Sequence, residues 1–207
     1  TSFYLSDNIE RQKELDYALN QNIKHKYIKN IILFLDDQKT YDYLTKNFNL
    51  EKIKTRILNR IPLFSDFFTC INIFNKNDEI YMICNNDIWL FPFSSFSTFH
   101  FNELHPIEIL RKLKNNMMLA LTRHEYNFEP KIMNKYGQLV NGSHDAFIFK
   151  GTVPNEIKKN TKFPQNLWGS ENALLDEFRV NNYCLYNPCF HIKIIHQHKE
   201  EERDNNR

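Results

Sequence analysis

The sequence predicts a single α/β domain in which a central, mostly parallel mixed sheet is flanked by helices. Short apolar runs of strand length alternate with longer stretches whose apolar residues recur at helical spacing. Two of the runs, Ile31–Leu35 and Ile80–Cys84, are apolar or aromatic throughout, which is typical of strands covered on both faces. We therefore expect both to be interior strands. The 207 residues suit one domain with a sizeable core.

The first expected elements are a strand at Thr1–Leu5 and a helix that runs to about Lys24. Asp7, with Glu10 three residues later, predicts the N-cap of this helix. The apolar stripe of the helix is formed by Leu15, Ala18, Leu19 and Ile23. The elements expected after it are the strand Ile31–Leu35, the helix Thr40–Asn47, the strand Lys52–Leu58, the helix Phe64–Phe74 and the strand Ile80–Cys84.

The second half of the chain continues the alternation and contains a long polar loop, Arg123–Gly142. Residues 1–198 are expected to form the domain, and the polar residues 199–207 a tail or linker. A helix at Ser170–Val180 would direct inward the side chains of Ala173, Leu174 and Phe178. The remaining expected elements are the helix Ile107–Lys114 and the strands Met117–Thr122, Asp145–Phe149, Tyr183–Tyr186 and Ile192–His198.

Composition and charge argue against several classes of protein. A net charge of +2, with acidic and basic residues interleaved, is weak for a nucleic-acid binder. Four glycines, without GxGxxG or GxxxxGK[ST], argue against a Gly-rich phosphate loop. The four cysteines form no CxxC pair, and no apolar run approaches the about 18 residues of a membrane span. No leader opens the chain, so a cytoplasmic protein without a membrane span is expected.

Ligands of α/β sheets bind outside the carboxyl ends of the strands, where this sequence places polar residues. Ser6-Asp7-Asn8, Asn85-Asn86-Asp87 and Arg123 all follow expected strands. Asp87 stands at the end of the apolar run IYMIC, where a carboxylate suits a hard divalent cation. The alternative is a plain turn, which Asn and Asp also favour.

His196 and His198 alternate along the last expected strand, so both imidazoles would point to the same face, roughly 6–7 Å apart. At that separation they would flank a metal ion or a diphosphate. The alternative is that one of them is exposed near the polar tail.

Three further candidates have ordinary structural alternatives. Ser143-His144-Asp145 opens a strand after the long loop, and either presents binding residues or caps the strand. Gly169-Ser170-Glu171-Asn172 begins a helix, where Ser170 as a cap and Glu171 against the dipole suffice. Arg60 and Arg123 follow strands, where a guanidinium would meet phosphate or form a surface ion pair.

The whole pattern resembles the glycosyltransferase domains encoded by large DNA viruses of algae and protists. The likeness begins with TSFYLSDNIERQKELDYALNQNI and IKNIILFLDD, in which Arg11-Gln12-Lys13-Glu14 matches an RQxE-like stretch on the first helix. Six further stretches follow in the family's order and extend the likeness over essentially the whole chain: RIPLFSDFFTCIN, EIYMICNNDIWL, LALTRHE, SHDAFIFKG, GSENALLDEF and YNPCFHIKIIHQH.

The resemblance implies a GT-A (Rossmann-like) fold and a hexosyl- or deoxyhexosyl-transferase. Its donor would be a nucleoside-diphosphate sugar, with UDP-sugar expected, and its acceptor a glycan or glycoprotein. A divalent metal, manganese or alternatively magnesium, would assist it. The host cytoplasm would be its location, and the chain would be one domain of a longer glycosylation protein.

By position, the resemblance also implies roles for individual residues. Asp87 would be the final acid of a metal-binding DxD-like element, and His196 or His198 would approach the metal or diphosphate. Asp145 would contact sugar hydroxyls, and either it or Glu171 would act as the base of an inverting enzyme. The nucleotide and donor sugar would be lined by Thr1, Ser2, Phe3, Arg60, Asn85, Asn86, Asp87, Arg123, His144 and Asn172.

Two departures from the family pattern keep other readings open. Asn85-Asn86-Asp87 lacks the first acid, so metal binding would be weaker, rest on one carboxylate or be absent. Glu171 stands where the family has a shorter acid. One alternative is a non-catalytic sugar- or nucleotide-binding module. The other is a metal-dependent phosphoesterase that uses Asp87, Asp145, His196 and His198.

Overall fold

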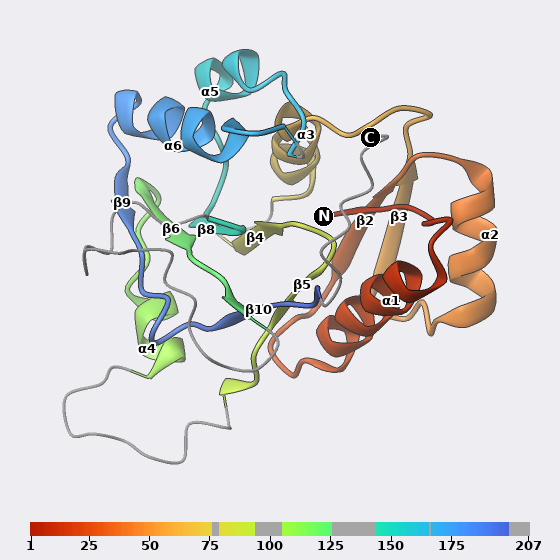
Figure 1. Ribbon diagram of the computed structural model, residues 1–207. Coiled ribbons are helices and arrows are strands. Elements are labelled where there is room, and N and C mark those ends of the chain that lie inside the picture. Colours follow the sequence, from red (N-terminus) through yellow and green to blue (C-terminus); the bar gives the residue numbers. More distant parts are fainter. Residues whose placement is uncertain (76–78, 94–104, 126–143, 166, 199–207) are drawn as a thin grey trace.

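The computed structural model describes residues 1–75, 79–93, 105–125, 144–165 and 167–198 (Figure 1). Most of the expected loop 123–142 and the tail 199–207 lie outside these residues. Within them the chain is an α/β protein, with a parallel sheet flanked by helices and two small mixed sheets. The expectation of one central sheet is corrected, because the described strands divide into three separately hydrogen-bonded sheets.

The parallel sheet has the order β1-β2-β3 and is covered on both faces at its middle strand. Leu33 packs with the helices α1 and α2, whereas Phe34 faces α3, where its ring lies 4.8 Å from that of Phe67. Because successive side chains of a strand point to opposite faces, both faces of β2 must be apolar, which confirms β2 as an interior strand. The elements are β1 (Ser2–Phe3), β2 (Ile31–Leu35), β3 (Ile53–Ile57), α1 (Ile9–Lys24), α2 (Gln38–Asn47) and α3 (Phe64–Phe74).

Short polar side chains fix where the first two helices begin. Asn8, and not the expected Asp7, caps α1, because its side chain accepts from the backbone N–H groups of Glu10 and Arg11. Asp37 caps α2 by accepting from Thr40, so this helix starts two residues earlier than expected. Both caps satisfy N–H groups that have no partner inside the helix.

The four-stranded sheet has the order β4-β8-β6-β9, and β8 runs antiparallel to both of its neighbours. β4 therefore lies at the end of this order, and its first residue, Ile80, is 43% exposed. The prediction of an interior β4 is wrong, although its last residues Ile83 and Cys84 are buried. The strands are β4 (Ile80–Cys84), β8 (Ala146–Lys150), β6 (Met117–Leu121) and β9 (Cys184–Tyr186).

Three helices gather over one face of this sheet and form an aromatic core with it (Figure 1). Phe68 of α3 lies 5.9 Å from Phe149 of β8 and 5.6 Å from Phe178 of α6, measured between ring centroids. Leu174 and Phe178 are buried as expected, but Ala173 is exposed, because it lies a quarter-turn away from that stripe. The two further helices are α5 (Asn155–Asn160) and α6 (Ser170–Val180).

A small third sheet joins distant parts of the chain. Its order is β5-β10-β7, with β10 antiparallel to β5 and parallel to β7. Sequence analysis assigned the residues of β7 to the polar loop. The chain enters this sheet three times from the four-stranded one, from β4 into β5, from β6 into β7 and from β9 into β10. Its strands are β5 (Ile88–Leu90), β7 (His124–Glu125) and β10 (Ile194–His196), and the nearby helix is α4 (Pro106–Arg111).

All four cysteines belong to the described part of the chain and have free thiols. None of the helices described is both long enough and apolar enough to cross a membrane.

Candidate functional site

Charged and polar side chains gather where the chain passes between the two mixed sheets. Asn85 and Asp87 lie between β4 and β5, and Arg123 lies between β6 and β7. Helix α1, strands β7 and β10, the residue before β8 and a residue shortly after β10 supply the others. We call this group the junction cluster; its members are Arg11, Glu14, Asn85, Asp87, Arg123, Glu125, Asp145, His196 and His198.

Asp87 is a buried carboxylate that contacts both α1 and β10. Its Oδ2 accepts from Arg11 Nη2 at 2.6 Å and lies 3.2 Å from His196 Nε2. Its Oδ1 is buried without a hydrogen-bond partner among the described residues. Burial alone would raise the pKa of Asp87, but His196 and Arg11 outweigh it and hold that pKa well below its usual range. Asp87 is therefore an ionised carboxylate with one oxygen still able to accept.

His196 lies between two carboxylates. Its Nε2 faces Asp87, and its Nδ1 lies 3.4 Å from Glu125 Oε2. Burial would lower the pKa of His196, but the contact with Asp87 raises it above the ordinary value. The pKa of Glu125 is lowered, because Arg123 and His196 outweigh its burial. The imidazole is thus favoured in its charged form, with both nitrogens donating.

Asp145 connects the segment between β4 and β5 with the segment between β6 and β7. Its Oδ1 accepts from Asn85 Nδ2 at 3.1 Å and from Arg123 Nη1 at 3.3 Å. Arg123 also donates through Nε to Glu125 at 3.3 Å. Asp145 is only 2% exposed, so its charge is balanced almost entirely by these protein groups. The carboxyl ends of β4 and β6 and the beginning of β8 therefore meet in one hydrogen-bonded group.

Arg11 and Glu14 had no role assigned from the sequence, although their RQKE stretch had been singled out. They project from the first turns of α1 and form an ion pair with a separation of 2.9 Å. One signal for Glu14 is its spacing, because Glu14, Ala18 and Asn22 follow at every fourth position and all are buried. Asn22 uses this face to bond the backbone of β5. A polar residue on a buried stripe requires partners, and this requirement could have identified Glu14.

The two histidines of β10 and its extension do lie on one side, as expected. Their ring centroids are 5.3 Å apart, somewhat closer than the spacing expected from strand geometry. His198 contacts Arg11 through Nδ1 at 3.0 Å. Burial and the nearby Arg11 charge lower the pKa of His198. The pair thus combines one imidazole that favours its charged form with one that favours its neutral form.

Other candidate residues have different surroundings. Phe3 is 1% exposed and packs against Phe48, and Thr1 donates from its amino group to the backbone of β2. Arg60 forms a two-pronged ion pair with Asp66 at the start of α3. These contacts lie outside the junction cluster. The roles expected for Thr1, Ser2, Phe3 and Arg60 stay predictions.

The start of α6 also differs in detail from the expectation. Gly169, with φ of 83°, is the N-cap, and a left-handed conformation of this kind favours glycine. Ser170 is the first helical residue and donates to Gln165 O. Glu171 and Asn172 follow in the first turn, with Asn172 exposed. The catalytic role expected for Glu171 stays a prediction.

Two candidates lie beside Asp145 and Asp87. His144 is buried, its Nδ1 lacks a hydrogen-bond partner in the described part of the chain, and burial lowers its pKa. Asn86 is half-buried in the turn that leads to Asp87. Ser143 lies outside the described residues.

The fit of a divalent metal depends on Arg11. The unpartnered Oδ1 of Asp87 and the imidazole of His198 are donors that a metal such as manganese accepts, whereas His196 would first have to lose a proton. However, Oδ2 of Asp87 and Nδ1 of His198 are already engaged by the Arg11 guanidinium. As they stand, the described residues contain no group of three or more His, Cys, Asp or Glu side chains arranged to hold a metal. The donors fit the ion only if Arg11 moves away.

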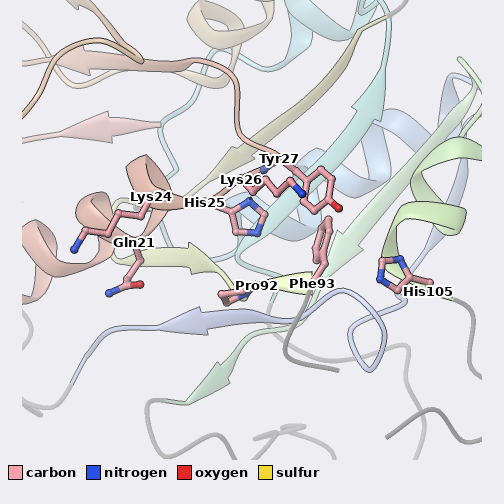
Figure 2. A pocket seen from close by; sticks show the side chains of 8 residues that line it. All are labelled: Gln21, Lys24, His25, Lys26, Tyr27, Pro92, Phe93 and His105. Carbon is pink, nitrogen blue, oxygen red and sulfur yellow. Dashed lines mark hydrogen bonds between the residues drawn. The ribbon is translucent and has the colours of Figure 1, made fainter. Parts of the chain in front are cut away.

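A pocket of about 280 Å³ lies at the other end of α1 (Figure 2). Helical rise places Lys24 about 20 Å along the axis from Arg11, so this pocket is separate from the junction cluster. Tyr27 and Phe93 stack on one side of it, with ring centroids 5.3 Å apart. The full lining is Gln21, Lys24, His25, Lys26, Tyr27, Pro92, Phe93 and His105.

No protein-family model matches the sequence, and comparison with curated proteins gives no match. The geometry of the junction cluster therefore carries the functional argument.

Proposed function

We propose that the protein is a glycosyltransferase that moves a sugar from a nucleoside-diphosphate sugar, most simply a UDP-sugar, to a glycan or protein-linked acceptor. The observation that carries this proposal is the junction cluster at the carboxyl ends of β4 and β6. α/β sheets bind their ligands at such edges. The cluster combines guanidinium groups, which suit phosphates, with carboxylates, which suit sugar hydroxyls.

The finer fold assignment, a GT-A domain, belongs to the same proposal. Its support is that the parallel sheet and the four-stranded sheet share one core, in which Phe34 of β2 packs in the same cluster as Ile83 of β4. The two sheets thus share one apolar core, even though they are separate in hydrogen bonding. Helix α3 packs in this core, whereas α1 packs on the other face of the parallel sheet.

The reaction requires stabilisation of a departing diphosphate, and the cluster contains three cationic side chains for this task. Arg123 is partly exposed, with 22% of its side chain accessible, so a phosphate oxygen can reach its guanidinium. Protonated His196 and Arg11 both contact Asp87. Preorganised charges of this kind stabilise negative charge as it develops in the transition state. A divalent metal, when bound by Asp87 and His198, would supply further neutralisation of the diphosphate.

The carboxylates divide the remaining tasks. Asp145 already accepts from Arg123 and Asn85, which fixes its orientation. In the proposal, Asp145 holds Arg123 and Asn85 in place and is the first candidate for contact with the donor sugar. Glu171 is the second candidate for the base that removes the acceptor proton, and its position in the first turn of α6 makes it accessible.

Release of UDP from a panel of UDP-sugars, with and without an added glycan acceptor, tests the proposal. Asp145→Asn and Arg123→Gln should each lower turnover by about a hundredfold or more while the circular dichroism spectrum is kept. Arg179→Gln is the matched control, because Arg179 forms an exposed ion pair with Asp176 on α6. It should not change turnover.

A second candidate, a non-catalytic nucleotide-sugar-binding module, is favoured by one observation. Asp87 lacks a neighbouring acid and is engaged by Arg11. A thermal-shift screen of nucleotide sugars separates the two functions, because a ligand that binds the native state raises the melting temperature. Stabilisation without turnover would support the binding module. Neither stabilisation nor turnover with any UDP-sugar would refute both.

A further inference from the structure

Side chains from three distant parts of the chain converge on the guanidinium of Arg11. Nη2 donates to Asp87 Oδ2 at 2.6 Å, and Nη1 donates to Glu14 Oε2 at 2.9 Å. Nη1 also contacts His198 Nδ1 at 3.0 Å. Because a guanidinium only donates, the His198 tautomer that accepts from Arg11 presents the Nδ1 lone pair to the positive charge, and the same Nδ1 lies 3.3 Å from Glu14 Oε2. Two carboxylate oxygens and one imidazole lone pair thus surround a single internal cation.

That donor set is also one that divalent transition metals take. Manganese and zinc bind carboxylate oxygens and neutral imidazole nitrogens. A fourth donor is at hand, because Oδ1 of Asp87 is buried without a partner among the described residues. Arg11 therefore fills the position at which a metal ion would meet Asp87, Glu14 and His198.

The charge of the surroundings favours a cation of higher valence. The junction cluster holds four carboxylates, those of Glu14, Asp87, Glu125 and Asp145, and two guanidinium groups, so acids outnumber arginines by two. A divalent ion in place of Arg11 would bring the group closer to neutrality. Arg11 has room to leave, because 15% of its side chain is exposed and a helix surface lets a long side chain turn outward.

We propose that Arg11 and a divalent metal ion are alternative occupants of one cation site formed by Asp87, Glu14 and His198. Arg11 competes with free metal and keeps its affinity low, and removal of the guanidinium opens the site. The inference assigns Glu14 to the site, where it had no role before. It rests on the contacts of Arg11 and not on the glycosyltransferase proposal.

Binding of Mn²⁺ in the absence of nucleotide, followed by electron paramagnetic resonance of the free ion, tests the competition. Arg11→Gln should bind Mn²⁺ at least about ten times more tightly than the wild type, a difference of ~1.4 kcal/mol. Adding Glu14→Gln or Asp87→Asn to this variant should abolish the gain. Lys13→Gln is the matched control, since it removes the same formal charge from an exposed pair with Glu10 on the same helix. Its affinity should equal that of the wild type.

Equal affinities of the wild type and Arg11→Gln would overturn the inference, as would a gain of the same size in Lys13→Gln. If Arg11→Gln does not fold, Arg11→Lys retains the charge as a single point and should bind Mn²⁺ about threefold more tightly than the wild type. No gain in that variant would also overturn it. UDP-sugar turnover is measured separately, so loss of the metal effect with turnover intact would remove only this inference.

Discussion

Replacement of Asp87 by asparagine removes one charge from a largely buried group of ion pairs in the junction cluster. Asp87 lies 2.6 Å from Arg11 and 3.2 Å from His196, so the variant leaves two cationic groups without their shared counterion. Two unit charges about 4 Å apart interact by about 4 kcal/mol at an effective dielectric constant of 20. Part of this loss is recovered, because a neutral amide is cheaper to bury than a carboxylate.

We expect the variant to fold but to lose about 2–3 kcal/mol of unfolding free energy, the size typical of a broken, partly compensated buried pair. For a chain of this length, that corresponds to a melting temperature lower by roughly 4–12 °C. Urea unfolding followed by circular dichroism measures the difference. Asp176→Asn, in an exposed ion pair, should cost less than about 0.5 kcal/mol.

The pH dependence distinguishes this explanation from a simple loss of packing. The raised pKa of His196 adds stability that is fully present below its ordinary value of about 6.5 and is lost as the pH rises through the raised pKa. The lowered pKa of Asp87 adds stability that is present above its ordinary value and is lost as the pH falls through the lowered pKa. The difference between wild type and Asp87→Asn should therefore be larger at pH 5.5 than at pH 8.5. A difference that is the same at both pH values would refute the ion-pair reasoning.

Three other substitutions give separate tests. Asn22→Ala should destabilise the protein by about 2–4 kcal/mol, because two backbone groups of β5 lose their buried partner; chemical denaturation measures it. Arg60→Ala should weaken UDP affinity in calorimetry and cost less than about 1 kcal/mol of stability, since its ion pair is exposed; unchanged affinity would rule out a nucleotide pocket there. His198→Ala should reduce Mn²⁺-dependent transfer less than Asp87→Asn does, and an equal or larger loss would reverse the ranking of these two groups.

Local sequence patterns predict the bounds of several helices and strands well. The bounds of β2, β4 and α3 match the expectation, because each begins or ends where a continuous apolar run meets polar residues. The position of β4 at the end of its sheet was not predictable in this way. Its pairing partner β8 follows more than sixty residues later, and a run of apolar side chains does not record which strand lies beside it.

The same limit applies to the junction cluster. Asp87 and His196 were foreseen because they directly follow or end apolar runs, where a charged group is unexpected. Arg11 and Glu14 lie on a helix rich in charged residues, most of which are exposed, so local composition gives them no special place. Glu125 was assigned to the polar loop, and its pairing with β10 becomes visible only when distant strands meet.

Strand β10 imposes an order on the formation of this site during synthesis. It pairs with both β5 and β7, and His196 lies 109 residues after its partner Asp87. While the ribosome is still making the intervening chain, Asp87 and Glu125 have no imidazole between them and remain hydrated. The buried members of the aromatic core around α3 and β8, in contrast, all precede residue 180. The junction cluster is therefore the later of the two groups to receive its last side chains.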